Sequence, residues 1–418
     1  MNKILHIKDL EDNLSVRMLT IHIVLFYSFG FTLLYFEQIH LFGIKISIMW
    51  KSLLIGFFLV MSFLKVGKNK SINYFILFYI LFSFKIFFSV SSLDNMSITF
   101  ELFIKSLFFI GLYLYFSYYL NIKTLILFGK HFSILIILSF LPFILGFLQP
   151  LSEGYGLYRF GAVDQFGLIG IFQRPHAASI SIAFSMIIIY FYSIYEKNIK
   201  IKYFYYLLLL LGLYEMIFTY VRTGILIFLI GFLYLYLTQK DKLKYLKIFI
   251  LIFIFALLFI YLYNTNEIFQ MRMSDQTIYN DAGNIGSGRF VYAYYAIQNW
   301  YSEGYESIVI GLGLDYAREL MYQDVGMRIF AHNGYIQILQ AEGLIGVFLY
   351  LSFLYFLIKF ILTKKQNMFY TINIAMLLAY LTMMFLQGGV YFYMMVYIST
   401  YLALMNKTKN IVRSNTCR

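Results

Sequence analysis

The chain has 418 residues, of which 61% are hydrophobic, 21% aromatic and only 13% charged. Soluble domains have about 45–50% apolar and about 25% charged residues. A chain this apolar cannot cover itself with a polar surface, so the composition excludes an ordinary soluble enzyme and predicts that lipid is the solvent. The net charge of +13 fits the basic loops of a membrane protein, so we expect no nucleic-acid partner. The single cysteine, Cys417, excludes a disulfide within the chain.

Apolar segments long enough to cross a bilayer as helices recur along the sequence. Their pattern predicts an all-α polytopic membrane protein, with one integral membrane domain over residues 1–418 and about twelve transmembrane helices. The first apolar segment follows a polar stretch with charges of both signs, so we expect a span and no cleaved signal peptide. The predicted spans are 18–36, 43–64, 72–90, 98–119, 131–149, 175–195, 203–220, 224–238, 247–263, 335–361, 370–388 and 390–405.

Lysine residues mark every second connection between the predicted spans. Because basic residues collect on cytoplasmic loops, this alternation places both termini in the cytoplasm. The basic residues after spans two, four, six, eight, ten and twelve are Lys65, Lys68, Lys70, Lys123, Lys130, Lys197, Lys200, Lys202, Lys240, Lys242, Lys244, Lys247, Lys364, Lys365, Lys407, Lys409 and Arg413.

The two long outer connections, 150–174 and 264–334, contain arginine and no lysine. Seven of the ten arginines are expected on the outer side: Arg159, Arg174, Arg222, Arg272, Arg289, Arg318 and Arg328. Outer loops can simply tolerate a few cations. The alternative, which we favour, is that guanidinium groups are used because they bind phosphate oxygens in bidentate fashion and never deprotonate. A lipid-linked diphosphate is the anion expected at this face.

The outer loop 264–334, between spans nine and ten, has structure of its own. Ser287 is a candidate cap for a helix over 289–301, which places Phe290, Tyr294 and Ile297 on one face. Aromatic residues favour headgroup depth, so we expect this helix at the membrane interface. The sequence GLGLD at 311–315 predicts a flexible break, and DYARELMYQ predicts a second short helix.

His332 and Asn333 come directly before span ten. Asn333 is a good helix cap, and a neutral imidazole at His332 can accept a proton from a sugar hydroxyl. The alternative is that His332 is a solvated residue at a helix end. Tyr335 and Glu342 follow on the span as substrate-binding candidates. A carboxylate at Glu342 needs a partner or water, and membership of an ion pair is the simpler interpretation.

Arg222 begins an apolar run in the sequence YVRTG. A charge there is costly unless it faces a water-filled cavity or a partner, although it can also extend to the membrane surface. Thr223 and Gly224 permit close approach of the backbone to a ligand.

Several further residues are weaker candidates. Arg159 lies in the preceding outer connection, and Arg174 and His176 flank Pro175, where a helix N-terminus could bind an anion. Arg318 and Arg328 are further substrate-binding candidates. The roles of four residues inside predicted spans stay open: Lys51, Lys85, Lys105 and Glu215.

Several other chemistries have no support in the sequence. It contains no GxxxxGK[ST], no HExxH and no CxxC, and GLGLD follows no βαβ pattern. We therefore expect no metal site and no nucleotide or other cofactor.

The run SGR…W…GLGLD…HNGYIQILQAEGLIG resembles the C-terminal signature of the O-antigen ligase and polymerase family, which includes Wzy-type polysaccharide polymerases and WaaL-like ligases. The earlier VRTG resembles the start of a span in that family, and RFGAV…FG…RPHAAS resembles its preceding outer loop. This chain departs from the family in having Val221 where serine is frequent, and RPH where asparagine-rich sequence is common.

The resemblance implies a GT-C-like, inverting glycosyltransferase of the bacterial inner membrane, independent of metal and nucleotide. Such enzymes use undecaprenyl-diphosphate-linked oligosaccharides on the periplasmic side. Arg222 and Arg289 match the family's diphosphate-binding arginines, and His332 matches its essential histidine, so these three are the catalytic candidates.

We expect a polymerase of O-antigen or capsular polysaccharide, with the lipid bilayer and a chain-length regulator as further candidate partners. The alternative is a ligase that transfers glycan to the lipid A-core of lipopolysaccharide. A transporter of an anionic or lipid-linked solute is a different class. It predicts inverted repeats and helices broken in the membrane, and the sequence shows neither.

Overall fold

The computed structural model describes residues 40–41, 44–66, 73–89, 96–148, 167–172, 175–239, 257, 259–266, 270, 289–326, 328–388 and 392–415. Within these residues the secondary structure is helical, apart from two short strands. Strand β1 (His40–Leu41) pairs antiparallel with β2 (Ile44–Lys45), and His40 lies opposite Lys45. This ladder is a small departure from the all-α prediction.

The helices follow the predicted spans closely. The helices of the membrane part are α2 (Ile46–Val66), α3 (Tyr74–Phe88), α4 (Met96–Tyr118), α5 (Ile122–Leu138), α6 (Leu141–Ile144), α7 (Pro175–Tyr195), α8 (Ile199–Phe218), α9 (Arg222–Leu237), α15 (Gly334–Leu362), α16 (Tyr370–Leu386) and α17 (Phe392–Asn415). The predicted span 18–36 lies outside the described residues, as does most of 247–263. The segments Ile122–Ile144, Pro175–Tyr195, Ile199–Phe218 and Gly334–Leu362 are long and apolar enough to cross a membrane. The apolar helices make the chain a membrane protein, and the total of about twelve spans stays a prediction.

The predicted start of the fifth span, at residue 131, is wrong. Helix α5 begins at Ile122, because Asn121 caps it by accepting a hydrogen bond from the Thr124 backbone N–H at 2.8 Å. Lys130 therefore lies within the helix instead of in the preceding connection, with its Nζ 5.8 Å from the centre of the Tyr205 ring.

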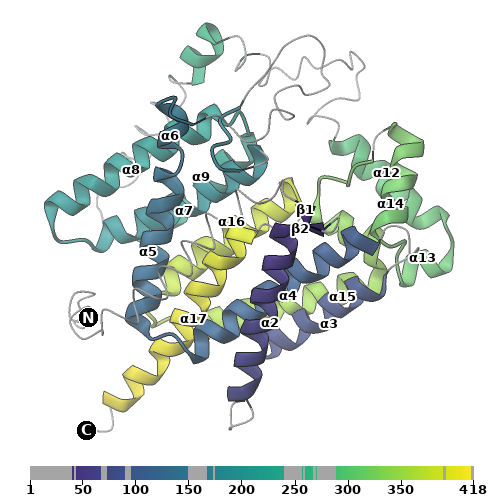
Figure 1. Cartoon of the computed structure of the whole chain (residues 1–418), viewed down its shortest axis with the longest axis horizontal. Coiled ribbons are helices and arrows are strands. Elements are labelled where there is room, and N and C mark those ends of the chain that lie inside the picture. The colour runs from purple at the N-terminus through teal and green to yellow at the C-terminus, as the bar shows by residue number, and fades with distance from the viewer. Residues whose placement is uncertain are drawn as a thin grey trace.

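The membrane part consists of two helix groups joined by α16 and α17 (Figure 1). Helices α2, α3, α4 and α15 form one group, in which α15 packs on α3 and α2 packs on α4. Helices α5, α7, α8 and α9 form the other, in which α7 contacts the other three. Helix α16 packs on α9 and α15, and α17 packs on α4 and α5, so these two helices connect the groups.

Helix α7 is the centre of the second group. Its residues from Ala178 to Ser193 are buried, as expected for an apolar helix surrounded by other helices. Helix α8 is different, because much of its apolar surface is exposed, including Tyr203 (66%) and Leu207 (62%). We infer that α8 faces lipid.

Helices α12 (Arg289–Ser302), α13 (Tyr305–Val309) and α14 (Leu314–Val325) form a separate group at one end of the molecule (Figure 1). Together with residues 328–342 we call this group the outer lobe. A small core of Ala296, Met321 and Ala331 holds it together. The predicted helices at 289–301 and in DYARELMYQ are confirmed, and α13 was not predicted. Ser287 lies outside the described residues.

One face of α12 carries exposed apolar side chains, as its sequence predicts. Phe290 is 70% exposed, Tyr294 64% and Ile297 42%. The opposite side packs on α14 and α15. The amphipathic character is therefore real, and the interfacial position of α12 stays a prediction.

Helix α15 is broken at Gly343, where φ is 63° and ψ is −166°. A break ends the first helical segment, so the carbonyls of its last turn lose their partners within the helix. The glycine-rich loop supplies replacements, since Leu312 N donates to Gln340 O and Gly313 N donates to Ala341 O, both at 2.9 Å. The expected flexible break at 311–315 is therefore a fixed, hydrogen-bonded segment. The predicted span 335–361 is confirmed as α15, but the break at Gly343 within it was not predicted.

Two glycines make this docking possible. Gly311 has φ 96°, and Gly343 lies against it so closely that a Cβ at either position would lie 2.5 Å from the backbone nitrogen of the other. Backbone atoms cannot move aside as a flexible side chain can. Gly311 of GLG and Gly343 of EGLIG therefore belong to one contact between the two backbones.

We expect Gly343→Ala to lower the apparent melting temperature of the purified protein. At φ 63° and ψ −166° the backbone is in a region almost restricted to glycine, where an L-residue costs about 1–3 kcal/mol, and the clash with Gly311 adds to that cost. Gly56→Ala is the matched control, because a Cβ there would meet no atom within 4 Å and alanine favours the helix. Equal melting temperatures for the two variants would contradict the assigned contact.

Candidate active site

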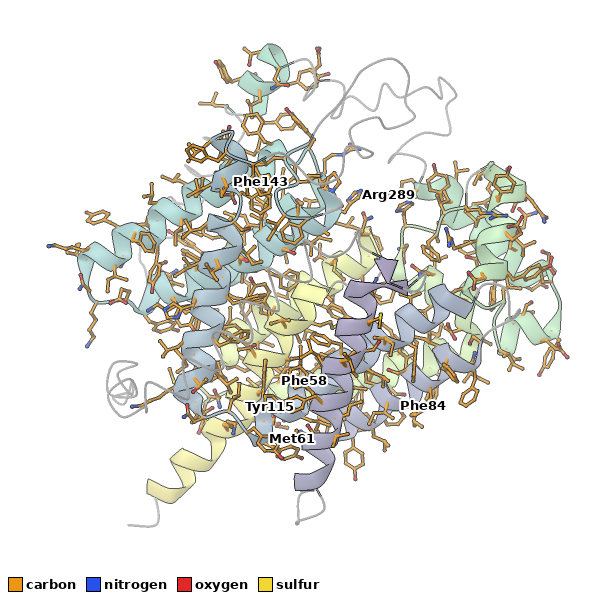
Figure 2. The ribbon with its side chains drawn as sticks, in the orientation of Figure 1. Phe58, Met61, Phe84, Tyr115, Phe143 and Arg289 are labelled. Atoms are coloured by element: carbon orange, nitrogen blue, oxygen red, sulfur yellow. The ribbon has the colours of Figure 1, made fainter. Side chains whose placement is uncertain are left out.

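Arg289, Tyr292 and His332 lie together in the outer lobe. Arg289 is the first residue of α12, and Tyr292 follows one turn later. The rings of Tyr292 and His332 have their centres 5.8 Å apart, and the charge of Arg289 is close enough to act on the His332 imidazole. Figure 2 shows Arg289 at the margin of the lobe that faces the rest of the molecule. The structure thus joins two of the three predicted catalytic residues.

The backbone fixes His332 in an uncommon conformation. Its φ is 50°, a region that residues with a Cβ rarely adopt and that often marks functional sites. The next residue, Asn333, caps α15, since its side-chain oxygen accepts from the backbone N–H of Tyr335 at 3.0 Å and of Ile336 at 3.2 Å. The predicted cap is confirmed. The cap anchors the residue after His332, so the imidazole is held at the start of the helix.

The surroundings of His332 keep its imidazole neutral. Burial and, as a smaller cause, the nearby positive charge of Arg289 together lower the pKa of His332 from its usual 6.5 to about 4. Both causes disfavour the charged imidazolium. The side chain is therefore able to accept a proton at neutral pH.

Arg222 is the first residue of α9, directly after a tight turn from α8. Tyr220 in this turn has φ 55°, so two of the candidate segments contain a non-glycine residue with positive φ. The N-cap residue Val221 offers no side-chain acceptor to the first turn of α9. The backbone N–H groups at a helix N-terminus together with a guanidinium favour an anion.

Gly224 has a different role from the one expected. A Cβ at Gly224 would lie 1.9 Å from the Ser179 hydroxyl of α7 and 2.8 Å from its carbonyl oxygen. The close approach that glycine permits is therefore to helix α7 instead of to a ligand. Ser179 also donates to the Val221 carbonyl at 3.4 Å, which fixes the start of α9 and hence the backbone of Arg222.

Arg318 and Arg328 stabilise the outer lobe. The Arg318 guanidinium lies 5.2 Å from the centre of the Phe330 ring, and its Nη2 donates to the Arg328 carbonyl at 3.2 Å. Arg328 forms an ion pair with Glu319 at 2.9 Å, and its side chain is 64% exposed. Their predicted part in substrate binding stays a prediction, and local contacts already explain both arginines.

Glu342 has the partner that a buried carboxylate needs. Its side chain is 3% exposed and pairs with Lys85 Nζ of α3 at 3.3 Å, and the Ser89 hydroxyl also donates to it. The expectation of an ion pair is confirmed, and Lys85 receives the partner that could not be named from the sequence. Substrate binding by Glu342 stays a prediction.

The remaining candidates are placed less directly. His176 is the second residue of α7 and Tyr335 the second of α15, and both are half-buried. Glu215 is fully buried near the end of α8, and neither carboxylate oxygen has a hydrogen-bond partner among the described residues. Lys51 is in α2 and Lys105 in α4. Arg159 and Arg174 lie outside the described residues.

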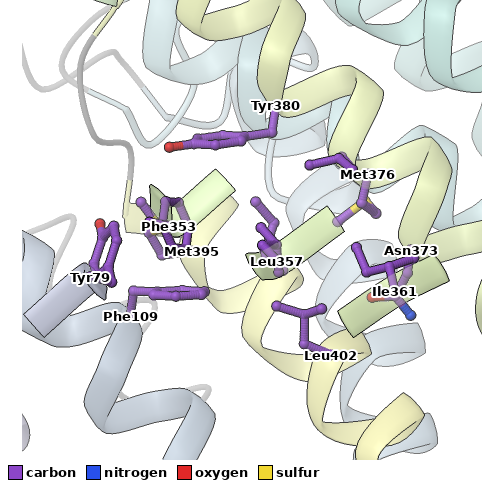
Figure 3. A pocket seen from close by; sticks show the side chains of 12 residues that line it. Tyr79, Phe109, Phe353, Leu357, Ile361, Asn373, Met376, Tyr380, Met395 and Leu402 are labelled. Atoms are coloured by element: carbon purple, nitrogen blue, oxygen red, sulfur yellow. The ribbon is translucent and has the colours of Figure 1, made fainter. Parts of the chain in front are cut away.

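An apolar cavity inside the membrane part is separate from these charges. It lies between α3, α4, α15, α16 and α17, and its lining includes Tyr79, Phe109, Phe353 and Tyr380 (Figure 3). No arginine, lysine, histidine or carboxylate lines it. A diphosphate could not bind there.

The sequence interpretation did not identify Tyr292 as part of the site. Tyr292 is three residues after Arg289, so the predicted helix already placed both on one face. Helical spacing from a candidate arginine is the signal that could have found it.

Comparison with known proteins gives one result for the chain. The family model described as O-Antigen ligase matches residues 207–351. The match includes Arg222, Arg289, Tyr292, His332 and the break at Gly343. The comparison with curated proteins gives no match. The match agrees with the resemblance found in the sequence motifs, and over residues 207–351 the chain is similar to the O-antigen ligase family.

Proposed function

We propose that the protein is a glycosyltransferase that polymerises O-antigen or capsular polysaccharide from an undecaprenyl-diphosphate-linked donor. The observation that carries the proposal is the grouping of Arg289, Tyr292 and a neutral His332 in the outer lobe, within the residues that match the O-antigen ligase family model. A cation for the diphosphate and a base for the acceptor are the two groups that such a transfer needs.

The reaction uses these groups as follows. The acceptor hydroxyl attacks the anomeric carbon of the donor sugar, and the bond from that carbon to the diphosphate oxygen breaks. The His332 imidazole accepts the hydroxyl proton, while the diphosphate leaves with the bonding electron pair on its polyprenyl carrier. Arg289 and Arg222 stabilise the negative charge that develops on the leaving group. Attack opposite the leaving group inverts the anomeric centre.

The acceptor separates the main proposal from its alternative. A polymerase uses a lipid-linked repeat unit as acceptor, and a ligase uses the lipid A-core. The family match does not distinguish the two acceptors, and the arginine and histidine groups would serve either one. Purified protein given lipid-linked repeat units alone distinguishes them, because only a polymerase lengthens the glycan.

The break in α15 reopens the comparison with a transporter, since broken helices are frequent in that class. In transporters the unwound backbone lines a binding cavity. Here the carbonyls of Gln340 and Ala341 are occupied by loop N–H groups. The carbonyls at the break therefore bind the protein's own backbone instead of a solute, so the break does not favour a transporter.

We expect Arg289→Gln and His332→Gln each to lower kcat about 100-fold or more in a reconstituted assay with lipid-linked repeat units, because each removes a group acting on the transition state. Arg289→Lys keeps the charge and loses the bidentate geometry, so its activity should fall between Arg289→Gln and the natural protein. Lys359→Gln, at an exposed lysine of α15, is the control. Full activity of both Arg289→Gln and His332→Gln would reject the proposal.

The low pKa of His332 predicts an unusual pH dependence. A base with an ordinary imidazole pKa would lose activity below about pH 6.5, whereas His332 stays neutral until the pH approaches 4. Activity should therefore be nearly constant from pH 7 to pH 5 and fall only below that. The measurement is kcat/KM against pH in nanodiscs, with protein integrity checked at each pH. A midpoint of 6.5 would contradict the assigned environment.

A further inference from the structure

A buried polar cluster joins the outer lobe to the membrane part. Lys85 Nζ, near the end of α3, donates to the Ile310 carbonyl at 2.7 Å and to the Ser89 hydroxyl at 2.6 Å. The same ammonium pairs with Glu342 at 3.3 Å, and Ser89 donates to Glu342. Side chains of α3 thus hold both the residue before the glycine loop and the residue before the break in α15. We call Lys85, Ser89, Glu342 and the Ile310 carbonyl the clasp.

The clasp lies at the break in α15, where the angle between the outer lobe and the membrane part is set. On one side of Gly343, residues 334–342 belong to the lobe and follow His332 directly. On the other side, residues 344–362 form a helix about 28 Å long at 1.5 Å per residue, close to the thickness of the hydrocarbon core. A residue between two helical segments can act as a pivot, because a change in its φ and ψ changes the angle between them. Groups that lock the pivot therefore set the angle of the lobe.

The lobe angle matters because the candidate site is divided. Arg289 and His332 move with the lobe, while Arg222 begins α9 and is fixed to α7 through Val221, Ser179 and Gly224. A diphosphate held by both arginines requires the two parts to be aligned. Misplacement of a catalytic group by about 1 Å can cost about 100-fold in rate.

We propose that Lys85 and Glu342 are positioning residues, which lock the break in α15 and thereby align the arginine and histidine of the lobe with Arg222. This inference rests on the proposed function for its effect on catalysis, while the effect on lobe orientation is independent of it. The ion pair touches no reacting atom and acts through the backbone at 310–313 and 340–343.

The test compares two single variants with their double variant. Glu342→Gln leaves the Lys85 ammonium buried without a carboxylate, and Lys85→Gln leaves a buried carboxylate without its cation. Breaking a buried pair by removing one partner is the costly change, whereas replacing both avoids the unpaired charge. In Lys85→Gln/Glu342→Gln two amides can bond to each other and to the Ile310 carbonyl. The double variant should therefore recover most of the lobe order and most of the activity that either single variant loses.

Lobe orientation is measured by distances between spin labels. With Cys417→Ser as background, labels on Gln323→Cys of α14 and Leu53→Cys of α2 report the separation of lobe and membrane part, because both positions are exposed. We expect a narrow distance distribution in the parent, broad distributions in the two single variants, and a narrow one in the double variant. Glu215→Gln, which removes another buried carboxyl group, is the matched control and should leave the distribution narrow.

Activity is measured on the same proteins. Each single variant should lose about 100-fold in kcat, and the double variant should be at least about tenfold faster than the slower single variant. Unchanged distance distributions in both single variants overturn the proposal, and so does a double variant whose loss of kcat is the product of the single losses.

Ser89→Ala removes one hydrogen bond without leaving a charge unpaired. It should give a smaller broadening and keeps the test valid if a single variant fails to fold.

The two proposals fail in different ways. A parent protein that transfers no sugar, together with the expected changes in label distance, rejects the glycosyltransferase and leaves the clasp intact. Normal dependence of transfer on Arg289 and His332, with no change in label distance, rejects the clasp alone.

Discussion

The structure of the outer half depends on one constraint: backbone polar groups near a bilayer must find partners within the protein. The break at Gly343 leaves the carbonyls of Gln340 and Ala341 without partners in the helix. The backbone N–H groups of Leu312 and Gly313 donate hydrogen bonds to these carbonyls. Neither segment could meet this requirement alone. Since the two backbones can approach so closely only where both carry glycine, the contact has one register. That register attaches the lobe, and with it the Arg289–His332 pair, to the membrane helices.

Electrostatics favours an anion at this place. Arg289 lies beside the half-buried imidazole of His332, which desolvation and, as a smaller cause, the charge of Arg289 keep neutral. The lobe therefore carries positive charge on Arg289 and leaves His332 able to accept a proton. A neutral base beside a permanent cation suits a reaction that removes a proton while negative charge grows on a diphosphate. Protonation of His332 would place two cations together, and the low pKa of the imidazole opposes this near neutral pH.

Hydropathy was sufficient to predict most helices, because an apolar run in lipid has few alternatives to a helix. Helical spacing of Phe290, Tyr294 and Ile297 predicted α12, and the capping preference of asparagine predicted the start of α15. The break at Gly343 was not predicted, since a single glycine within an otherwise apolar span is compatible with a continuous helix and the partner of the break, the loop at 311–313, is far away in the sequence. The Lys85–Glu342 pair joins residues far apart in sequence, and one sequence carries no signal for that contact. The early start of α5 was missed because a lysine within a helix looks like part of a loop.

Arginine is frequent in the predicted outer connections for two physical reasons. The sequence suggested that guanidinium groups gather on the outer side to bind phosphate. Arg318 instead stacks on Phe330 and holds the Arg328 carbonyl, and Arg328 pairs with Glu319. A planar group with several donors can stack on a ring and bond a carbonyl at the same time, which an ammonium does poorly. A bias toward arginine therefore identifies the lobe but not the site within it. Arg289 is distinguished by its position one helical turn from Tyr292 and beside the half-buried His332. Arg222 is distinguished by its position at the start of a helix, where α7 fixes its backbone.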